Sequence, residues 1–310
     1  MAEKVFRHIP VMLDSVIELL DVKEDGVYFD GTLGGGGHTK AILEKGKNVR
    51  VFATDLDEFA IASAKENLKD YADRLTVFHD NFKNFGRLVG DERFDGILLD
   101  LGVSSAQLDI RERGFSYLAE DERLNMRMDE SQGLSAYEVV NIYKEEELER
   151  ILRVYGEEKF SRAIARNVVL ARQDSPIETC GELVKIIDRS IPYKFKRDGH
   201  PAKKTFQAIR IEVNGELDGL DKALYDMADK LKPQGRLAVI TFHSLEDRIV
   251  KTVFKDLATG CTCDKRFPVC VCGRVQKVRE ITRKPITSDT EELNANPRAK
   301  SAKLRVVEKL

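Results

Sequence analysis

A run of four glycines, Gly34 to Gly37, follows a short apolar segment, Val27–Phe29, and precedes a helix-like stretch, Thr39–Glu44. Strand, glycine loop and helix in this order bring backbone N–H groups close to a nucleotide-like ligand. Because glycine has no Cβ atom, the run lets such a ligand approach the backbone. A flexible surface turn would look similar, so this interpretation needs support from the residues that follow.

The next segments supply that support. Residues 49–55 read as a second strand that ends in Asp55, and an acid about 20 residues past a glycine loop suits hydrogen bonds to a ribose diol. Residues 75–79 and 94–100 read as a third and a fourth strand, and the fourth ends in Asp100. Strands that alternate with helical segments predict an α/β fold with a mostly parallel, doubly wound sheet.

The alternation stops between residues 114 and 215, where helical segments occur without a clear strand. We therefore predict one α/β domain, made of residues 1–113 and 216–310, with an inserted all-α domain at 114–215. The predicted helices of the insert are 136–143, 145–155, 159–173 and 179–189.

After the insert the α/β pattern resumes. An amphipathic helix is predicted over Glu212–Leu231, a strand over Arg236–Phe242, and a further helix that begins with a capping box at Ser244. Two terminal strands, Val275–Ile281 and Lys303–Val307, are expected to form an antiparallel hairpin at the sheet edge.

Composition limits the function classes. None of the apolar runs in the 310 residues approaches the roughly 20 needed to cross a bilayer, and the first residues lack a signal-peptide core, so a cytoplasmic protein without a membrane partner is expected. The net charge is only −2, yet residues 189–210 hold seven Lys/Arg against one acid, and residues 265–310 hold twelve against five. Local basic patches on a near-neutral chain suit a phosphate-bearing polymer, although a solvated surface is the alternative.

Four of the five cysteines form two C-x-C pairs, Cys261 with Cys263 and Cys270 with Cys272. Two such pairs could hold a tetrahedral zinc ion, but the usual knuckle spacing is C-x-x-C. Reduced or disulfide-linked cysteines are therefore the favoured interpretation, and no metal is predicted. Cys180 has no partner in view and is expected to be structural.

The strand ends carry the predicted chemistry, because ligands of open α/β sheets bind at the carboxyl ends of the strands. Asp30 lies four residues before the glycine run, a form that fits S-adenosylmethionine (SAM) enzymes better than the G-x-G-x-x-G loop of dehydrogenases. Asp100 and the carbonyls beside Gly102 could orient an amine for attack on a sulfonium methyl group. Ser104 and Ser105 either face the substrate or cap a helix.

Nine sequence blocks then resemble the RsmH (MraW) family, the bacterial 16S ribosomal RNA cytosine-N4 methyltransferases. The resemblance covers nearly the whole chain. Two departures are Ala106, where the family often has Pro, and Asn125, where Asp is usual. The blocks are residues 30–38, 95–105, 113–116, 125–129, 155–158, 200–202, 205–214, 242–248 and 296–305.

The resemblance implies a SAM-dependent, Rossmann-like methyltransferase fold with a helical insertion between the fourth and fifth strands. It implies SAM as methyl donor, S-adenosylhomocysteine as product, and the N4 amine of a cytidine in the decoding region of 16S rRNA, within the 30S subunit, as acceptor. Asp100 is the expected catalytic residue. The implied SAM contacts are Gly34, Gly36, Gly37, His38, Asp55, Phe82, Asp100 and Gln107.

Substrate contacts are less constrained by the sequence. Phe206 is our first candidate for stacking on RNA, although His243 could instead be bonded locally and Arg210 could pair with Glu212 or a core carboxylate. Three rival functions remain: a SAM-binding ribosome assembly factor without turnover, a nicotinamide-dependent dehydrogenase and a DNA amino-methyltransferase. A homodimer also stays open. The predicted RNA contacts are Ser104, Ser105, His200, Phe206, Arg210, His243 and Arg248.

Overall fold

A computed structural model describes residues 10–104, 107–108, 110–196, 200–264 and 269–310. Its contacts divide the chain into two units. Residues up to Gly102 together with Asp218–Leu310 form one unit, here the sheet unit, and Val103–Leu217 form the helical unit. The helical unit therefore begins eleven residues before the predicted boundary at 114. The reason is that Val103 and Leu108 pack against the helical core.

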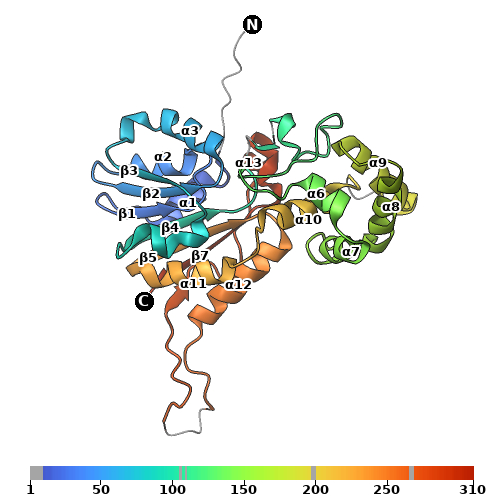
Figure 1. Cartoon of the computed structure of the whole chain (residues 1–310). Helices are drawn as coiled ribbons and strands as arrows, with labels where there is room; N and C mark the ends of the chain where they lie inside the picture. Colours follow the sequence, from blue (N-terminus) through green and yellow to red (C-terminus); the bar gives the residue numbers. More distant parts are fainter. Residues whose placement is uncertain (1–9, 105–106, 109, 197–199, 265–268) are drawn as a thin grey trace. The chain divides into compact units, whose positions relative to one another are not determined.

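The sheet unit is built on a sheet of seven strands in the order β3-β2-β1-β4-β5-β7-β6 (Figure 1). The first five strands in this order pair in parallel, whereas β7 pairs antiparallel with both β5 and β6. The fold class predicted from the sequence is confirmed, and so is the antiparallel edge. The strands are β1 Val27–Asp30, β2 Arg50–Asp55, β3 Leu75–His79, β4 Phe94–Asp100, β5 Leu231–Thr241, β6 Val278–Glu280 and β7 Lys303–Lys309.

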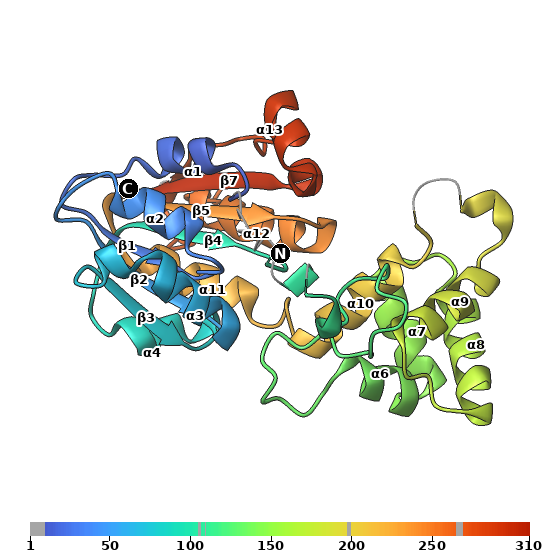
Figure 2. The ribbon, with the colours of Figure 1, turned by 90° about the horizontal axis from the view of Figure 1, so that it is seen from above.

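Helices cover both faces of this sheet (Figures 1 and 2). Alternate residues of one strand point to opposite faces, so that Leu98 packs on one side, and Ile97 and Leu99 on the other. The first face is covered by α1 Leu13–Leu20, α2 Gly37–Leu43 and α3 Glu58–Asn67. The second face is covered by α4 Phe85–Val89, α11 Leu220–Lys230 and α12 Ser244–Ala258.

Short elements complete the sheet unit. They are the 3₁₀ helices η1 Lys69–Tyr71, η2 Phe82–Asn84 and η5 Pro297–Ser301 and the helix α13 Thr290–Ala295. None of the described helices is long and apolar enough to cross a membrane.

The helical unit packs its helices around an apolar core of its own. Capping boxes start two of the helices, with Ser135 paired to Glu138 and Thr179 paired to Glu182. Apart from one antiparallel bridge between Arg123 and Thr179, the described part of this unit contains no strand. The elements are η3 Arg111–Arg113, α6 Ala136–Ile142, α7 Glu145–Val154, α8 Ser161–Asp174, α9 Cys180–Ser190, η4 Tyr193–Phe195 and α10 Lys203–Asn214.

The helix predicted over Glu212–Leu231 is wrong as a single element. Gly215 adopts a left-handed conformation with φ of 55° and ends α10, and Gly219, with φ of 68°, precedes α11. Glycine takes up this conformation without the steric cost that other residues carry, so two glycines four residues apart break the apolar period.

Candidate active site at the carboxyl ends of the strands

The loop after β1 is tied to both neighbouring strands by backbone hydrogen bonds. Gly31 N–H donates to the Leu98 carbonyl of β4, and Leu33 N–H donates to the Thr54 carbonyl of β2, both at 2.9 Å. Gly34 N–H donates to Asp55 Oδ2 at 2.7 Å. The loop is therefore a fixed part of the carboxyl edge of the sheet.

The glycines of this loop have different reasons to be glycine. Gly34 and Gly36 have φ of 51° and 82°, a region that strains other residues. A Cβ on Gly36 would lie 2.8 Å from Leu68, and one on Gly37 would lie 2.3 Å from Pro10. Two of the four glycines are thus required by the chain's own packing, in addition to the ligand access expected from the sequence.

Asp55, at the end of β2, accepts two backbone hydrogen bonds. Gly34 N–H donates to Oδ2, and Asp57 N–H donates to Oδ1 at 2.9 Å. Burial raises the pKa of Asp55 to about 6 even though both bonds favour its charged form. A carboxylate oxygen has two lone pairs, so Asp55 keeps the capacity to accept hydrogen bonds from hydroxyl groups.

Asp100, at the end of β4, is held by its backbone and leaves its carboxylate available. Its N–H donates to Thr32 Oγ1 at 2.6 Å. Its side chain is 19% exposed, and Oδ1 is buried without a hydrogen-bond partner in the described part of the chain. A buried acceptor without a donor costs free energy, and a bound ligand can recover that cost.

Carboxylates gather around Asp100. Burial, followed by repulsion from Asp30 and Glu246, raises the pKa of Asp100 well above its usual value. Burial also raises the pKa of Asp30, whose Oδ2 accepts a hydrogen bond of 2.7 Å from the Thr39 hydroxyl. A positively charged ligand at this edge would relieve the repulsion, whereas an anionic one would increase it.

His38 lies beside this group on α2. Its Nε2 is 2.9 Å from the Val11 carbonyl, which can only accept, so Nε2 carries the proton. Burial lowers the pKa of His38 to about 4, and the ring is therefore neutral at physiological pH. Its Nδ1 lies 3.7 Å from Asp100 Oδ2 and does not neutralise that carboxylate.

Phe82 begins η2 and lies next to the glycine loop. A Cβ built on Gly31 would be 3.0 Å from the Phe82 Cβ and 2.3 Å from Leu99 Cδ2. The Phe82 ring is half-buried against the core of the second sheet face. The predicted SAM contacts of the sheet unit (Gly34, Gly36, Gly37, His38, Asp55, Phe82 and Asp100) thus lie on neighbouring segments of one sheet edge.

The start of α12 reaches the same group of carboxylates through Glu246, a residue that the sequence analysis treated only as part of a cap. The N-cap is His243 rather than the predicted Ser244. Glu246 N–H donates to His243 Nδ1, and Glu246 Oε2 accepts from the N–H groups of Phe242 and His243. His243 is therefore used locally, as one of its two interpretations expected, and Arg248 is exposed one turn further on.

In the helical unit, the predicted contact Gln107 interacts with Ser104. Ser104 N–H donates to Gln107 Oε1 at 3.0 Å, and Gln107 N–H donates to Ser104 Oγ at 3.2 Å. This reciprocal pair is the arrangement of a capping box, which favours the cap interpretation of Ser104. Ser105 lies outside the described residues.

Phe206 is corrected as an RNA contact. Its side chain is 3% exposed and belongs to the helical core, so its ring offers no face to a nucleobase. Arg210 donates two hydrogen bonds to Glu216, of 2.7 and 2.8 Å, and pairs with that residue rather than with Glu212. His200 stacks on Tyr117 with ring centroids 4.4 Å apart.

Exposed aromatic side chains occur nearby in the sequence, on η4. Tyr193 is 81% exposed and Phe195 52% exposed. The Lys194 ammonium lies 5.0 Å from the Phe195 ring centroid. The basic run around these residues was recognised from the sequence, but Tyr193 was not identified as an exposed ring. Its position between Pro192 and Lys194 was the signal that could have indicated exposure.

The carboxyl edge fits SAM better than a nicotinamide dinucleotide. A sulfonium cation would lie among the carboxylates of Asp30, Asp55 and Asp100, whereas a pyrophosphate would add negative charge to them. An open hollow of about 360 Å³, lined by Arg93 and Asp229 among others, lies instead at the amino ends of β4 and β5. The hollow is therefore separate from this chemistry.

Comparison with known proteins agrees with this geometry. The model of the MraW methylase family matches residues 5–310. The ribosomal RNA small subunit methyltransferase H of Clostridium botulinum (strain Kyoto / Type A2) is 55% identical over 309 residues, which cover 98% of this chain and 99% of the relative. That of Brevibacillus brevis is 51% identical over 310 residues and covers 98% of both.

Solved structures are more distant. An rRNA methylase from Streptococcus thermophilus is 14% identical with a TM-score of 0.40, over 96% of this chain and 93% of that chain. The fold assignment therefore rests on the sheet topology described above.

Proposed function

This chain belongs to the MraW methylase family, and from that premise we propose that it transfers a methyl group from SAM to the N4 amine of a cytidine in the decoding region of 16S rRNA. The observation that carries the proposal is Asp100. Its buried Oδ1 has no donor in the described residues, and it ends the strand next to the glycine loop. When bound, SAM supplies an electrophilic methyl group on sulfur.

The sheet unit's residues divide the work of binding. Asp55 accepts hydrogen bonds from the ribose hydroxyls, and the half-buried Phe82 ring packs on the adenine. The backbone at Gly34 and Gly36 admits the methionine part, and the carboxylates around Asp100 favour the positive charge on sulfur. Gln107 remains a predicted SAM contact of the helical unit.

Asp100 acts on the target amine. Its free Oδ1 accepts an N–H bond from N4 and thereby turns the nitrogen lone pair toward the methyl group. Methylation leaves N4 with one proton too many, and the raised pKa of Asp100 makes this carboxylate a suitable acceptor for it. His38 lies beside Asp100 but is neutral, so it does not neutralise the Asp100 carboxylate.

Substrate recognition falls to the helical unit in this proposal. The target cytidine must leave its stack, and exposed rings beside basic side chains hold unstacked bases. Tyr193, Lys194 and Phe195 offer such a surface, and they replace the buried Phe206 as the first RNA-contact candidates. The proposed substrate is 16S rRNA within the assembled 30S subunit. A protein that acts on this particle is expected in the cytoplasm.

The test is transfer of labelled methyl groups from SAM to unmodified 30S subunits, naked 16S RNA and DNA in parallel, followed by nucleoside mass spectrometry. N4-methylcytidine in the 30S sample, lost in Asp100→Asn while SAM still binds, is the expected result. Binding of SAM without transfer would favour the assembly factor, and labelling of DNA alone would favour the DNA enzyme. Light scattering on the same preparation tests the homodimer.

A further inference from the structure

The segment between α12 and β6 carries four cysteines and little apolar packing. Its described residues, 259–264 and 269–277, form no helix or strand. Three of its valines are largely exposed, so that the described residues of the segment have no hydrophobic core of their own. The valines are Val269 at 70%, Val271 at 77% and Val275 at 78% exposure.

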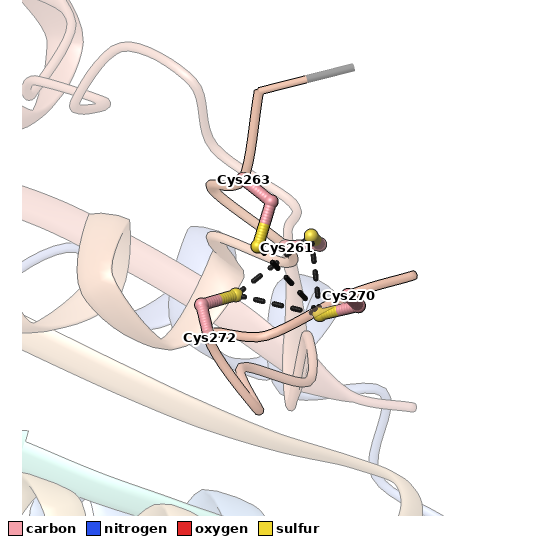
Figure 3. A group of neighbouring side chains, drawn as sticks. All are labelled: Cys261, Cys263, Cys270 and Cys272. Carbon is pink, nitrogen blue, oxygen red and sulfur yellow. Dashed lines mark hydrogen bonds between the residues drawn. The ribbon is translucent and has the colours of Figure 1, made fainter. Parts of the chain in front are cut away.

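The two arms of the segment nevertheless run side by side. At their base, Lys277 N–H donates to the Leu257 carbonyl at 2.9 Å, and Arg274 contacts Asp256. Gly260 faces Gln276, whose Cβ would be 3.7 Å from an added Cβ. Further out, the cysteines of one arm meet those of the other (Figure 3).

The four sulfur atoms of these cysteines form a compact group. All of them are within 4.8 Å of one another. Four of the separations are 3.4 Å for Cys261–Cys270, 3.6 Å for Cys270–Cys272, 3.7 Å for Cys261–Cys272 and 4.0 Å for Cys263–Cys270. Zinc–sulfur bonds of about 2.3 Å in a tetrahedron place the sulfurs about 3.8 Å apart, and these four separations lie within about 0.4 Å of that value.

From this geometry we propose that Cys261, Cys263, Cys270 and Cys272 bind one structural Zn²⁺ ion that clips the two arms together. Four thiolates fill a tetrahedral coordination sphere and leave no position open for a substrate. The role is therefore structural: the ion supplies the cross-link that the exposed segment lacks. The unusual C-x-C spacing argued against zinc in the sequence, but the opposing arms bring the two pairs together.

The surroundings of the sulfurs suit thiolates. Val271 N–H donates to Cys263 Sγ at 3.4 Å. Such N–H···S bonds orient and stabilise metal thiolates.

The proposed zinc site is distinct from the proposed active site. Asp100 lies at the carboxyl end of β4, and α12 begins at that edge with His243 as its cap. The fifteen residues of α12 span about 22 Å before the cysteine segment starts. Failure of methyl transfer and failure of zinc binding can therefore be observed separately.

The first test is metal content. The full chain, purified without chelators and with reductant, is analysed by plasma mass spectrometry beside Cys263→Ser/Cys270→Ser and the control Cys180→Ala. Cys180 is buried in the helical unit and tests the loss of a thiol elsewhere. We expect about one zinc per chain in the parent and in Cys180→Ala, and a loss of at least tenfold in the double variant, with SAM affinity unchanged.

A second measurement covers loss of metal during purification. The metal-free reduced chain is titrated with Co²⁺, and tetrahedral thiolate coordination is read from its charge-transfer and d–d absorption bands. Saturation at one equivalent, competed away by Zn²⁺ and absent in the double variant, supports the site. Three results would each overturn the proposal: iron in place of zinc, equal metal content in the parent and the double variant, or an intact mass showing that two disulfides persist in the parent purified with reductant.

Discussion

The carboxyl edge of the sheet and the Arg210–Glu216 pair of the helical unit use charged side chains in opposite ways. At the sheet edge, Asp55 and Asp100 form no ion pair with a Lys or Arg among the described residues, and burial raises the pKa of both. In the helical unit, Arg210 is closed onto Glu216 by two hydrogen bonds. Buried carboxylates without a cation cost folding free energy, so their presence marks a binding site, whereas the closed pair serves the unit's own stability.

The sharpest test of this difference is Asp100→Asn. The amide keeps the shape but can neither accept the proton nor oppose the positive charge that develops on N4, so methyl transfer to 30S subunits should fall by about 10²- to 10⁴-fold. The unfolding free energy of Asp100→Asn should instead be higher than that of the parent. Because the folded state raises the pKa of Asp100, its ionisation opposes folding above the unfolded pKa, and the amide removes that cost.

We therefore expect the melting temperature of Asp100→Asn to exceed that of the parent at pH 8, with a smaller difference at pH 5. The exposed Asp73→Asn serves as control and should change neither quantity. A variant that loses both transfer and stability would mean that Asp100 is structural.

Two phenylalanines of the helical unit separate burial from recognition. Phe206→Ala removes a core ring and should cost about 3–5 kcal/mol of unfolding free energy, measured by urea denaturation. Phe195→Ala removes a half-exposed ring and should leave most of the stability, yet weaken binding to a single-stranded rRNA fragment by about 1–3 kcal/mol. Unchanged RNA affinity in Phe195→Ala would remove η4 from the proposed interface.

The sheet was predictable because its signals are local and its topology follows a general rule. Apolar segments ending in Asp55 and Asp100 fix the strands, and parallel pairing then puts both acids at one edge. The partners of these acids were not predictable. That Asp100 Oδ1 lacks a donor among the described residues, or that Glu246 approaches from α12, depends on how separate helices pack.

The helical insert was predicted as a class but not in its surface. Lys203 and Lys204 made the segment before Phe206 look like an exposed basic patch, whereas it forms α10. Phe206, Ile209 and Val213 share one face of that helix at spacings of three and four, and this period was the missed signal for burial. The proposed zinc site could not be predicted from the sequence for a related reason. Its geometry depends on the contact between the arm with Cys261 and Cys263 and the arm with Cys270 and Cys272.

The pH dependence of Asp55 provides a graded test within the sheet unit. Its pKa is about 6 in the folded chain against 3.8 as its ordinary value, so between these values the folded state binds more protons. The contribution of Asp55 to stability is therefore greatest below about pH 4 and is lost as pH rises through 6. The stability of Asp55→Asn minus that of the parent should increase by about 3 kcal/mol over this range.

That difference is measured by denaturant unfolding at several pH values, with Asp73→Asn as the flat control. The SAM affinity of the parent should instead increase as pH rises through 6, because protonation of Asp55 below pH 6 removes an acceptor for the ribose hydroxyls. A constant difference across the range would show that Asp55 titrates as an ordinary surface acid.

The smallest effect is expected where the charges are already paired. Glu216→Gln replaces the charged acceptor of two Arg210 hydrogen bonds by a neutral one. This should cost about 2 kcal/mol of unfolding free energy, because hydrogen bonds to charged groups stabilise more than those between neutral groups. SAM affinity should not change, in contrast to the pH-dependent SAM affinity expected from Asp55. Arg210→Met/Glu216→Leu, which removes the pair together, should recover part of the loss. If Glu216→Gln instead abolished methyl transfer at unchanged stability, the pair would belong to substrate binding, and the contrast between the two units would fail.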